Sequence, residues 1–400
     1  MSTSRDLDLV LVGATGFVGR LTAAYLAASA PSGVRIGLAA RSGDRLDRLI
    51  AQLPDHAASW PRVTVDATDA SQVTDLVRRT RAVATTVGPY DRYGHELVAA
   101  CAAAGTHYAD LTGEVLFVRK VIQRHHRRAQ DTGAVIVPSC GFDSVPSDLA
   151  VLLAADAARE DGEGRLVEAT LHVRDARGGM GGGTIDTLRG QVAAMHADPA
   201  ARRVVGDPDA LAEARTAYGR GPRPIGKDTD SGRWHGPFFM SPYNTRVVRR
   251  SWSLTEGAAP LVYEEVADTT TGWRGAATAA GIGLGTGALA AVMAFPVTRG
   301  LADRVLPSPG EGPSERTRAA GRFAFEVDAV TTTDARYRSR VAARLDPGFD
   351  ATAVMLGESG LALASGEAVQ AGVLTPATAL GQTLPDRLRS HGFTVEVTRQ

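Results

Sequence analysis

The sequence has little cysteine, few aromatic residues and no excess of charge of either sign. Cys101 and Cys140 are its only cysteines, and both lie in apolar stretches, which argues against a disulfide framework and favours a reducing compartment. Lysine and arginine number 44, and aspartate and glutamate also number 44, so no general electric field attracts nucleic acid or an anionic membrane. Aromatic residues make up 6% of the chain, which predicts a core of aliphatic side chains.

Strongly hydrophobic runs are also scarce. The first six residues lead directly into a strand pattern, without the basic and apolar parts of a secretory signal, so we expect a cytoplasmic protein.

Residues 275–297 carry no charge and are long enough to reach across a bilayer, but most of them are Ala, Gly and Thr. Three alternatives stay open for this segment: a buried or surface-packed helix, a peripheral contact with lipid, or a membrane span.

The chain length and the hydrophobic pattern predict two domains. In residues 1–145, short β-rich runs alternate with helical patterns, as in βαβ units around a parallel sheet. The expected strands are residues 7–12, 34–40, 63–65, 82–87, 108–111 and 134–137. The predicted fold class is therefore α/β, with a Rossmann-type doubly wound parallel sheet.

Residues 146–370 predict a second, α+β domain with a mixed or antiparallel sheet, which would serve substrate binding or dimerisation. Its expected strands are residues 168–174, 246–254, 261–267, 323–331 and 335–345. Segments rich in Gly and Pro, at residues 218–233 and 307–314, predict loops. Residues 371–400 predict a helix at 377–390 and a strand at 393–397, and we expect this piece to return to the first domain.

A glycine cluster follows the first expected strand and precedes a helical pattern. Gly13, Gly16 and Gly19 have the spacing G-x-x-G-x-x-G, one residue wider at its start than the dinucleotide fingerprint but in the same structural context. Glycines at this place let backbone N–H groups approach a pyrophosphate at the positive end of the helix. The cluster therefore predicts a dinucleotide site.

The end of the second expected strand distinguishes between the two nicotinamide cofactors. Arg41 and Ser42 stand where an NAD enzyme usually carries an acidic residue. A guanidinium and a hydroxyl suit a 2′-phosphate, which predicts NADPH; the alternative is a solvated arginine beside a helix-capping serine. Asp66 would contact the adenine or cap a helix. The predicted cofactor-binding residues are Gly13, Ala14, Thr15, Gly16, Phe17, Gly19, Arg41, Ser42, Asp66, Val87, Gly88 and Pro89.

Polar residues gather after the predicted strands, where doubly wound sheets bind their ligands. Tyr90 is a catalytic candidate that would polarise a carbonyl group, or else a packed tyrosine. Asp110 is a candidate acid or orienting group, or else a cap for its loop. Tyr93 and Asp143 are candidate substrate contacts.

A second glycine-rich segment, in residues 178–184, precedes an expected helix. Gly182 and Thr184 are candidate substrate contacts there, with a flexible turn as the alternative. Arg246, Arg249 and Arg250 would form an exposed basic strand edge or bind the phosphate of a carrier's prosthetic group. The spacing of histidines and cysteines predicts no metal site.

Several motifs together resemble the saccharopine dehydrogenase family. They lie at residues 13–19, 40–41, 88–90, 93–94, 108–114 and 138–148, and weaker ones lie at 237–238, 245–251, 309–314 and 372–377. The likeness is closest to the branch of trans-acting enoyl reductases in actinobacterial polyketide lipid synthesis. This resemblance implies NADPH-dependent reduction of a C=C bond in an acyl or polyketide thioester on a separate synthase or carrier protein.

Two other functions remain alternatives. One is a C–N oxidoreductase that acts on an amino or imino acid, which would need converging basic groups to bind its carboxylates. The other is a non-catalytic, lipid-associated protein that binds NADPH. A homodimer and a peripheral membrane contact are further expectations, and a nucleic-acid partner is not expected.

Overall fold

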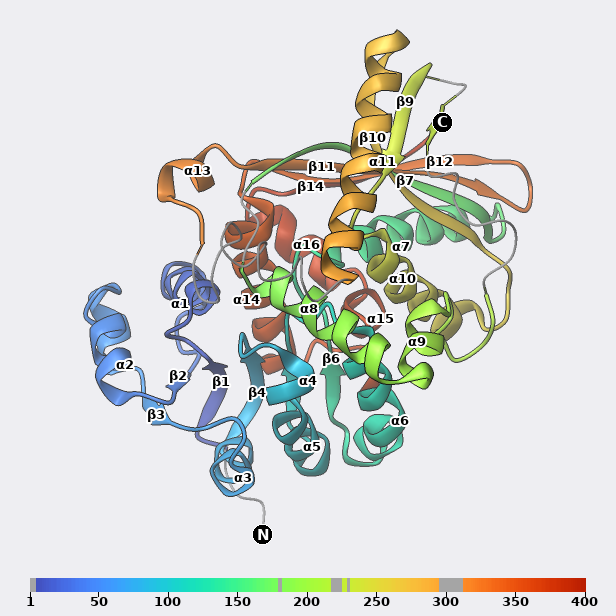
Figure 1. The fold of residues 1–400 in the computed structure, drawn as a ribbon. Coiled ribbons are helices and arrows are strands. Elements are labelled where there is room, and N and C mark those ends of the chain that lie inside the picture. Colours follow the sequence, from blue (N-terminus) through green and yellow to red (C-terminus); the bar gives the residue numbers. More distant parts are fainter. Residues whose placement is uncertain (1–4, 179–181, 217–224, 229–230, 295–311) are drawn as a thin grey trace. The chain divides into compact units, whose positions relative to one another are not determined.

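The computed structural model describes residues 5–178, 182–216, 225–228, 231–294 and 312–400 (Figure 1). These residues form two compact units. The first contains the chain up to Val145 and returns for residues 348–391; the second contains most of the chain between them and residues 392–400. The first unit thus takes in residues 348–370, which the sequence pattern had placed in the second domain.

The first unit is built on a parallel sheet with strand order β13-β6-β5-β4-β1-β2-β3. This arrangement confirms the predicted Rossmann-type fold. The order reverses between β4 and β1, which is the point where such sheets bind ligands at the carboxyl ends of their strands. The strands are β1 (Leu7–Val12), β2 (Ile36–Ala40), β3 (Arg62–Thr64), β4 (Thr80–Thr85), β5 (His107–Ala109), β6 (Val135–Val137) and β13 (Gly372–Val373).

The helices of this unit include one that the sequence pattern does not predict. It is α14 (Thr352–Ala364), whose residues are all buried. Gly357 and Gly360 let it lie close to α1 and β1, because a Cβ at these positions would come within 2.6 Å of the Tyr25 ring and 3.1 Å of Leu9. The other helices are α1 (Phe17–Ser29), α2 (Gly43–Ile50), α3 (Ala70–Arg78), α4 (Tyr90–Tyr93), α5 (His95–Ala104), α6 (Val115–Thr132), α15 (Pro376–Leu380), α16 (Thr383–Ser390) and the short 3₁₀ helix η1 (Asp55–Ser59).

The second unit contains a mixed sheet with strand order β14-β12-β11-β7-β10-β9-β8. Only the β7–β10 pair is parallel among its described strands. The strands are β7 (Leu166–Arg177), β8 (Gly226–Lys227), β9 (Arg233–Pro237), β10 (Val262–Thr271), β11 (Arg322–Thr331), β12 (Arg336–Ala343) and β14 (Thr394–Arg399). The helices are α7 (Val145–Glu160), α8 (Gly182–Ala197), α9 (Pro199–Gly206), α10 (Ser241–Glu256), α11 (Gly272–Ala294) and α13 (Glu315–Ala319), and a π-helical turn η2 (Pro347–Ala351) leads back to the first unit.

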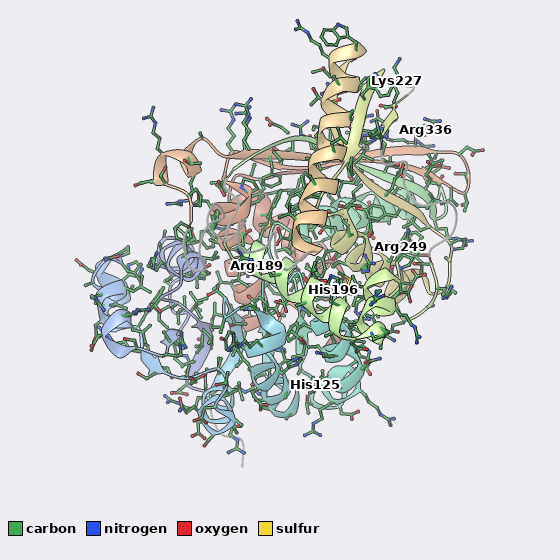
Figure 2. All side chains as sticks on the ribbon, viewed as in Figure 1. His125, Arg189, His196, Lys227, Arg249 and Arg336 are labelled. Carbon is green, nitrogen blue, oxygen red and sulfur yellow. The ribbon has the colours of Figure 1, made fainter. Side chains whose placement is uncertain are left out.

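The strand expected at residues 246–254 is wrong, because these residues lie within α10. Pro242 fits the first turn of a helix, where its missing N–H costs nothing. The expected exposed basic edge is wrong as well: Arg246 and Arg249 are each 8% exposed and Arg250 is 1% exposed (Arg249 is labelled in Figure 2). Their guanidinium groups donate instead to backbone carbonyls, among them those of residues 205, 207, 211 and 263.

The C-terminal piece divides between the two units instead of returning whole to the first. β13 pairs with β6, whereas β14 pairs with β12 in the mixed sheet. The helix expected at 377–390 is two helices, because the chain turns at Gly381 with φ +49°. The loop expected at 218–233 contains β8 in its described part, and the loop expected at 307–314 lies mostly outside the described residues.

The uncharged segment at 275–297 forms most of α11, and its last residues lie outside the described part of the chain. α11 packs along β9 and β10 of the mixed sheet. Among the described residues, no helix combines the length and the apolar character that crossing a membrane requires.

Candidate functional site

The glycine loop lies between β1 and α1, at the switch point of the parallel sheet. Gly13 has φ +84°, and a Cβ there would lie 2.8 Å from Thr86 Oγ1, so only glycine fits without strain. A Cβ on Gly19 would lie 2.1 Å from the carbonyl oxygen of Gly13. No side chain caps α1 at Gly16. The loop therefore brings backbone to the surface at a helix N-terminus, which is the geometry that binds a pyrophosphate.

The neighbouring strand β4 holds this loop in place. Thr86 Oγ1 donates a hydrogen bond of 3.0 Å to the carbonyl oxygen of Gly13, and Val87 N donates to Thr85 Oγ1 at 3.2 Å. The predicted residues Val87, Gly88 and Pro89 follow β4 directly, so they lie at the same edge of the sheet as the glycine loop. Ala14 is fully buried, whereas Thr15 and Phe17 are partly exposed.

The ends of β2 and β3 carry the three residues predicted for the adenosine half. Arg41 is exposed. Asp66 accepts hydrogen bonds from Thr68 N at 2.9 Å and Thr68 Oγ1 at 2.7 Å, and these bonds, with the charge of Arg41, hold the pKa of Asp66 below its usual value. Ser42 caps α2 by accepting from Arg45 N at 3.4 Å. Ser42 therefore fills the capping role that the sequence left as the alternative.

A cavity of about 240 Å³ beside the glycine loop adds residues that the sequence analysis missed. It lies between α1 and α2 and contains three arginine side chains but no acidic one. Arg45, Arg48 and Leu49 are three and four residues apart on α2, which puts them on one side of the helix, a signal that was available in the sequence. The residues that line the cavity are Thr15, Arg20, Arg45, Arg48, Leu49 and Gln52.

Tyr90 is held inside the first unit by hydrogen bonds to backbone. Its side chain is 5% exposed, its hydroxyl donates to the carbonyl of Thr85 at 3.1 Å, and Leu111 N donates to it at 3.1 Å. Burial raises the pKa of Tyr90 well above its usual value. The hydroxyl therefore has a backbone partner on each side, and the catalytic role of Tyr90 stays a prediction.

Asp110 is also fully buried. Its carboxylate accepts from Thr112 N and Ser139 N, each at 2.9 Å, and from Tyr108 Oη at 2.8 Å. Burial raises its pKa to about 7. Since these bonds join the loops after β5 and β6, Asp110 orders the carboxyl edge of the sheet, and its catalytic role stays a prediction.

Glu114 has a similar role that the sequence analysis did not assign. Its two carboxylate oxygens accept from the N–H groups of Tyr90, at 2.7 Å, and Asp91, at 2.8 Å, in the first turn of α4. Burial raises its pKa. Glu114 therefore fixes the turn that carries Tyr93. The Tyr93 ring is partly exposed, and the guanidinium carbon of Arg92 lies 5.0 Å from the centre of this ring.

Asp143 differs from the other carboxylates of this edge. It lies in the loop between β6 and α7 and is partly exposed. Burial raises its pKa to about 6. Among the described residues, no hydrogen bond or ion pair engages it, so its carboxyl group remains available for a ligand.

The remaining predicted substrate residues lie in the second unit. Gly182 begins α8 and Thr184 lies in its first turn. Residues 179–181 of the preceding glycine-rich segment are outside the described part of the chain. In the portions that the structure describes, no three His, Cys, Asp or Glu side chains form a group that could hold a metal ion.

Replacing Gly13 tests the geometry of the loop. Gly13→Ala should destabilise the protein by about 1–2 kcal/mol for the left-handed backbone alone, and it should also weaken NADPH binding, because the new Cβ displaces Thr86 and Val87. Gly33→Ala is the matched control, since Gly33 has φ +92° with nothing within 4 Å of a Cβ. Thermal unfolding and NADPH titration of both variants give the comparison; equal NADPH affinities would contradict the placement of the loop.

Comparisons with known proteins agree with a dinucleotide-binding domain in the first unit. A family model described as the saccharopine dehydrogenase NADP binding domain matches residues 9–137. A Mycobacterium tuberculosis protein named as a trans-acting enoyl reductase is 45% identical over 418 aligned positions, covering 100% of this chain and 99% of its own. A trans-acting enoyl reductase of Mycobacterium bovis BCG is 43% identical over 416 positions, covering 99% of this chain and 98% of its own.

A solved structure shows the same fold at low identity. Apo saccharopine dehydrogenase (L-Glu forming) from Saccharomyces cerevisiae aligns with a TM-score of 0.51 and 12% identity, over 98% of this chain and 99% of the yeast protein. The dinucleotide geometry and the match to an NADP-binding domain identify the nicotinamide cofactor as NADPH. With 45% identity over its whole length, the chain belongs to the family of trans-acting enoyl reductases and is an NADPH-dependent oxidoreductase.

Proposed function

We propose that this protein reduces the C=C bond of an acyl or polyketide thioester that a separate synthase or carrier protein presents during lipid biosynthesis. The observation that carries the proposal is the identity of 43% with the trans-acting enoyl reductase of Mycobacterium bovis BCG, which extends over both units and not only over the NADP-binding domain. Because the second unit is included, the likeness covers more than cofactor binding.

The first unit would hold the cofactor through three groups of residues. The loop from Gly13 to Gly19 would bind the pyrophosphate, and Arg41, with the arginines of the adjoining cavity, would bind the 2′-phosphate. Residues 87–89 would line the path toward the nicotinamide. When bound there, NADPH supplies a hydride for the β-carbon of the enoyl group.

Asp143 is our candidate for the proton that completes the reduction. Hydride addition at the β-carbon leaves negative charge on the α-carbon and the thioester oxygen, and the α-carbon must then take a proton. The Asp143 carboxylic acid would donate that proton, become a carboxylate and regain a proton from water. Its raised pKa of about 6 keeps part of it protonated near neutral pH. Tyr93, on α4 at the same sheet edge, is our candidate for contact with the acyl chain.

Tyr90 and Asp110 would act as positioning residues in this scheme. They fix the loops after β4, β5 and β6 through the hydrogen bonds to Thr85, Leu111 and Ser139. Such support keeps the reacting groups in one geometry, which is where much of the rate enhancement of an enzyme arises.

The direct test mixes the purified protein with NADPH and an enoyl thioester on a carrier protein, or with pairs of amino and keto acids, and follows nicotinamide absorbance. Oxidation of NADPH with the enoyl thioester alone is the expected result. Oxidation with an imine-forming pair would favour the C–N alternative. Binding of NADPH without oxidation in either mixture would favour the non-catalytic alternative.

The pH dependence of the reaction tests Asp143. Because the protonated acid is required and its pKa is about 6, kcat should fall about tenfold per pH unit above that value. Asp143→Asn should lower kcat about a hundredfold and remove this pH dependence. Asp131→Asn, an exposed carboxylate at the end of α6, is the matched control. The same slope in Asp143→Asn as in the wild-type protein would exclude Asp143 as the proton donor.

We further propose a cytoplasmic location. Cys101 and Cys140 are both free and buried, which suits a reducing compartment in which disulfides do not persist.

A further inference from the structure

One side of α11 packs on the mixed sheet, and the opposite side is exposed. The buried side includes Gly275 and Ala279. Helical spacing places five apolar or small residues on the exposed side, within a narrow arc. We call them the α11 face; they are Trp273, Ala277, Gly281, Leu284 and Ala288, and all five are exposed.

The α11 face lacks the charges that an exposed helix surface normally carries. A helix that is apolar on all sides is usually covered on all sides, yet Trp273 and Leu284 are each 76% exposed. Arg274 is the only charged residue of α11. Ile225, which is 40% exposed, enlarges the apolar surface, because its Cδ1 would lie 3.3 Å from a Cβ on Gly283.

Two cations border this surface at the start of the helix. The Arg274 guanidinium lies 5.6 Å from the centre of the Trp273 ring. Lys227, labelled in Figure 2, is exposed and pairs with Trp234 across β8 and β9, and Trp234 lies against the first turn of α11 at Gly275. Within the described residues, no carboxylate forms an ion pair with either cation.

Asp228 follows Lys227, and its carboxylate accepts a hydrogen bond from the hydroxyl of Ser231. Lys227, Arg274 and Asp228 together carry a net positive charge. An exposed tryptophan with basic residues at one end of an apolar surface is the combination that favours the boundary between water and an anionic lipid layer.

We propose that the α11 face binds peripherally to the surface of an anionic bilayer. The helix lies on the bilayer: Trp273 and Leu284 enter the headgroup region, and Lys227 and Arg274 contact lipid phosphates. This contact does not depend on the proposed reaction, and it would keep the protein where long acyl products collect.

Vesicle flotation of the full-length protein tests the contact. Vesicles of phosphatidylcholine mixed with phosphatidylglycerol should carry the protein upward, and vesicles of phosphatidylcholine alone should carry less of it. Leu284→Asp and Trp273→Ala should each weaken partition at least about tenfold, because they remove apolar surface from the lipid. Lys227→Ser and Arg274→Ser should each weaken it about fivefold, and only on anionic vesicles.

Val369→Asp is the matched control, because Val369 is 69% exposed and lies in the first unit. It should float like the wild-type protein. Circular dichroism and NADPH affinity should be unchanged in every variant, so that a loss of flotation reports the surface and not the fold.

Two results would overturn the proposal. The first is equal partition of the wild-type protein and Leu284→Asp on anionic vesicles. The second is a wild-type dimer that becomes a monomer in Leu284→Asp, as measured by light scattering, without a change in flotation. A second copy of the chain would then cover the α11 face. Oxidation of NADPH by the enoyl thioester in solution is unaffected by either result, so the two proposals fail separately.

Discussion

Arg41→Asp should raise the Kd for NADPH about a hundredfold while changing the Kd for NADH far less. The guanidinium is exposed at the end of β2 and has no hydrogen-bonded acidic partner among the described residues, so it is free to pair with the 2′-phosphate. A hydrogen bond to a charged group contributes about 1.5–3 kcal/mol. The substitution also places a new carboxylate that repels the 2′-phosphate, and it removes the cation that offsets the charge of Asp66. Fluorescence titration with both cofactors measures the two constants.

Arg127→Asp is the control for the change in net charge. Arg127 is exposed on α6 and away from the glycine loop. It should leave both dissociation constants within about twofold of the wild-type values, because exposed charges at a distance are screened by salt. An equal loss of NADPH and NADH affinity in Arg41→Asp would contradict binding of the 2′-phosphate by this residue.

Glu358→Ala should lower the free energy of unfolding by roughly 3 kcal/mol. Glu358 is the acidic residue of the buried helix α14 and is 1% exposed. It accepts from the Tyr25 hydroxyl of α1 at 2.5 Å and from Arg387 Nη1 of α16 at 2.8 Å. Removing Glu358 leaves the partly buried Tyr25 hydroxyl without this acceptor and leaves Arg387 with Glu367 alone, which is more costly than losing an exposed ion pair. Urea unfolding measures the change.

Glu367→Ala isolates the contribution of burial. Glu367 also pairs with Arg387, at 2.7 Å, but its side chain is 36% exposed. Its removal should therefore cost about 1 kcal/mol or less. Equal losses for Glu358→Ala and Glu367→Ala would mean that the buried network does not hold α14 and α16 against the cofactor helix α1.

The features that the sequence predicts well are local in the chain. The strands β1, β2 and β6 are short apolar runs, and Gly13 and Gly16 lie between β1 and α1, with Gly19 in the first turn of α1. Their meaning depends on neighbours within about twenty residues, as in any dinucleotide fingerprint. Family motifs added the reaction class, which no local pattern contains.

The features that the sequence does not predict depend on contacts across the chain. α14 is buried on every side, so its apolar residues are not confined to one face and show no helical period to detect. In α10, the β-branched Val247 and Val248 favour a strand. The buried arginines of this segment donate to backbone carbonyls of residues 205–211, and these contacts stabilise the helix. Arginines are seldom buried, so the sequence placed them at the surface.

The candidate site shows the same division. Arg41 lies directly after β2, as its place in the sequence predicts, whereas Arg20, Arg45 and Arg48 come together only in the folded chain, at the cavity that they line. Tyr90 and Asp110 attracted a catalytic interpretation through their residue type and their place after a strand. Their hydrogen bonds to backbone, which the sequence does not reveal, are the reason that we propose positioning roles for them.

Isotope transfer tests the central claim most directly. The protein is mixed with NADPH deuterated at the transferred position of C4 and an enoyl thioester on a carrier protein, and the acyl product is analysed by mass spectrometry. The account predicts one deuterium at the β-carbon, and a second at the α-carbon only when the solvent is D₂O. Deuterium on a carbon bonded to nitrogen in a parallel mixture of amino and keto acids, with an unlabelled acyl chain, would contradict it.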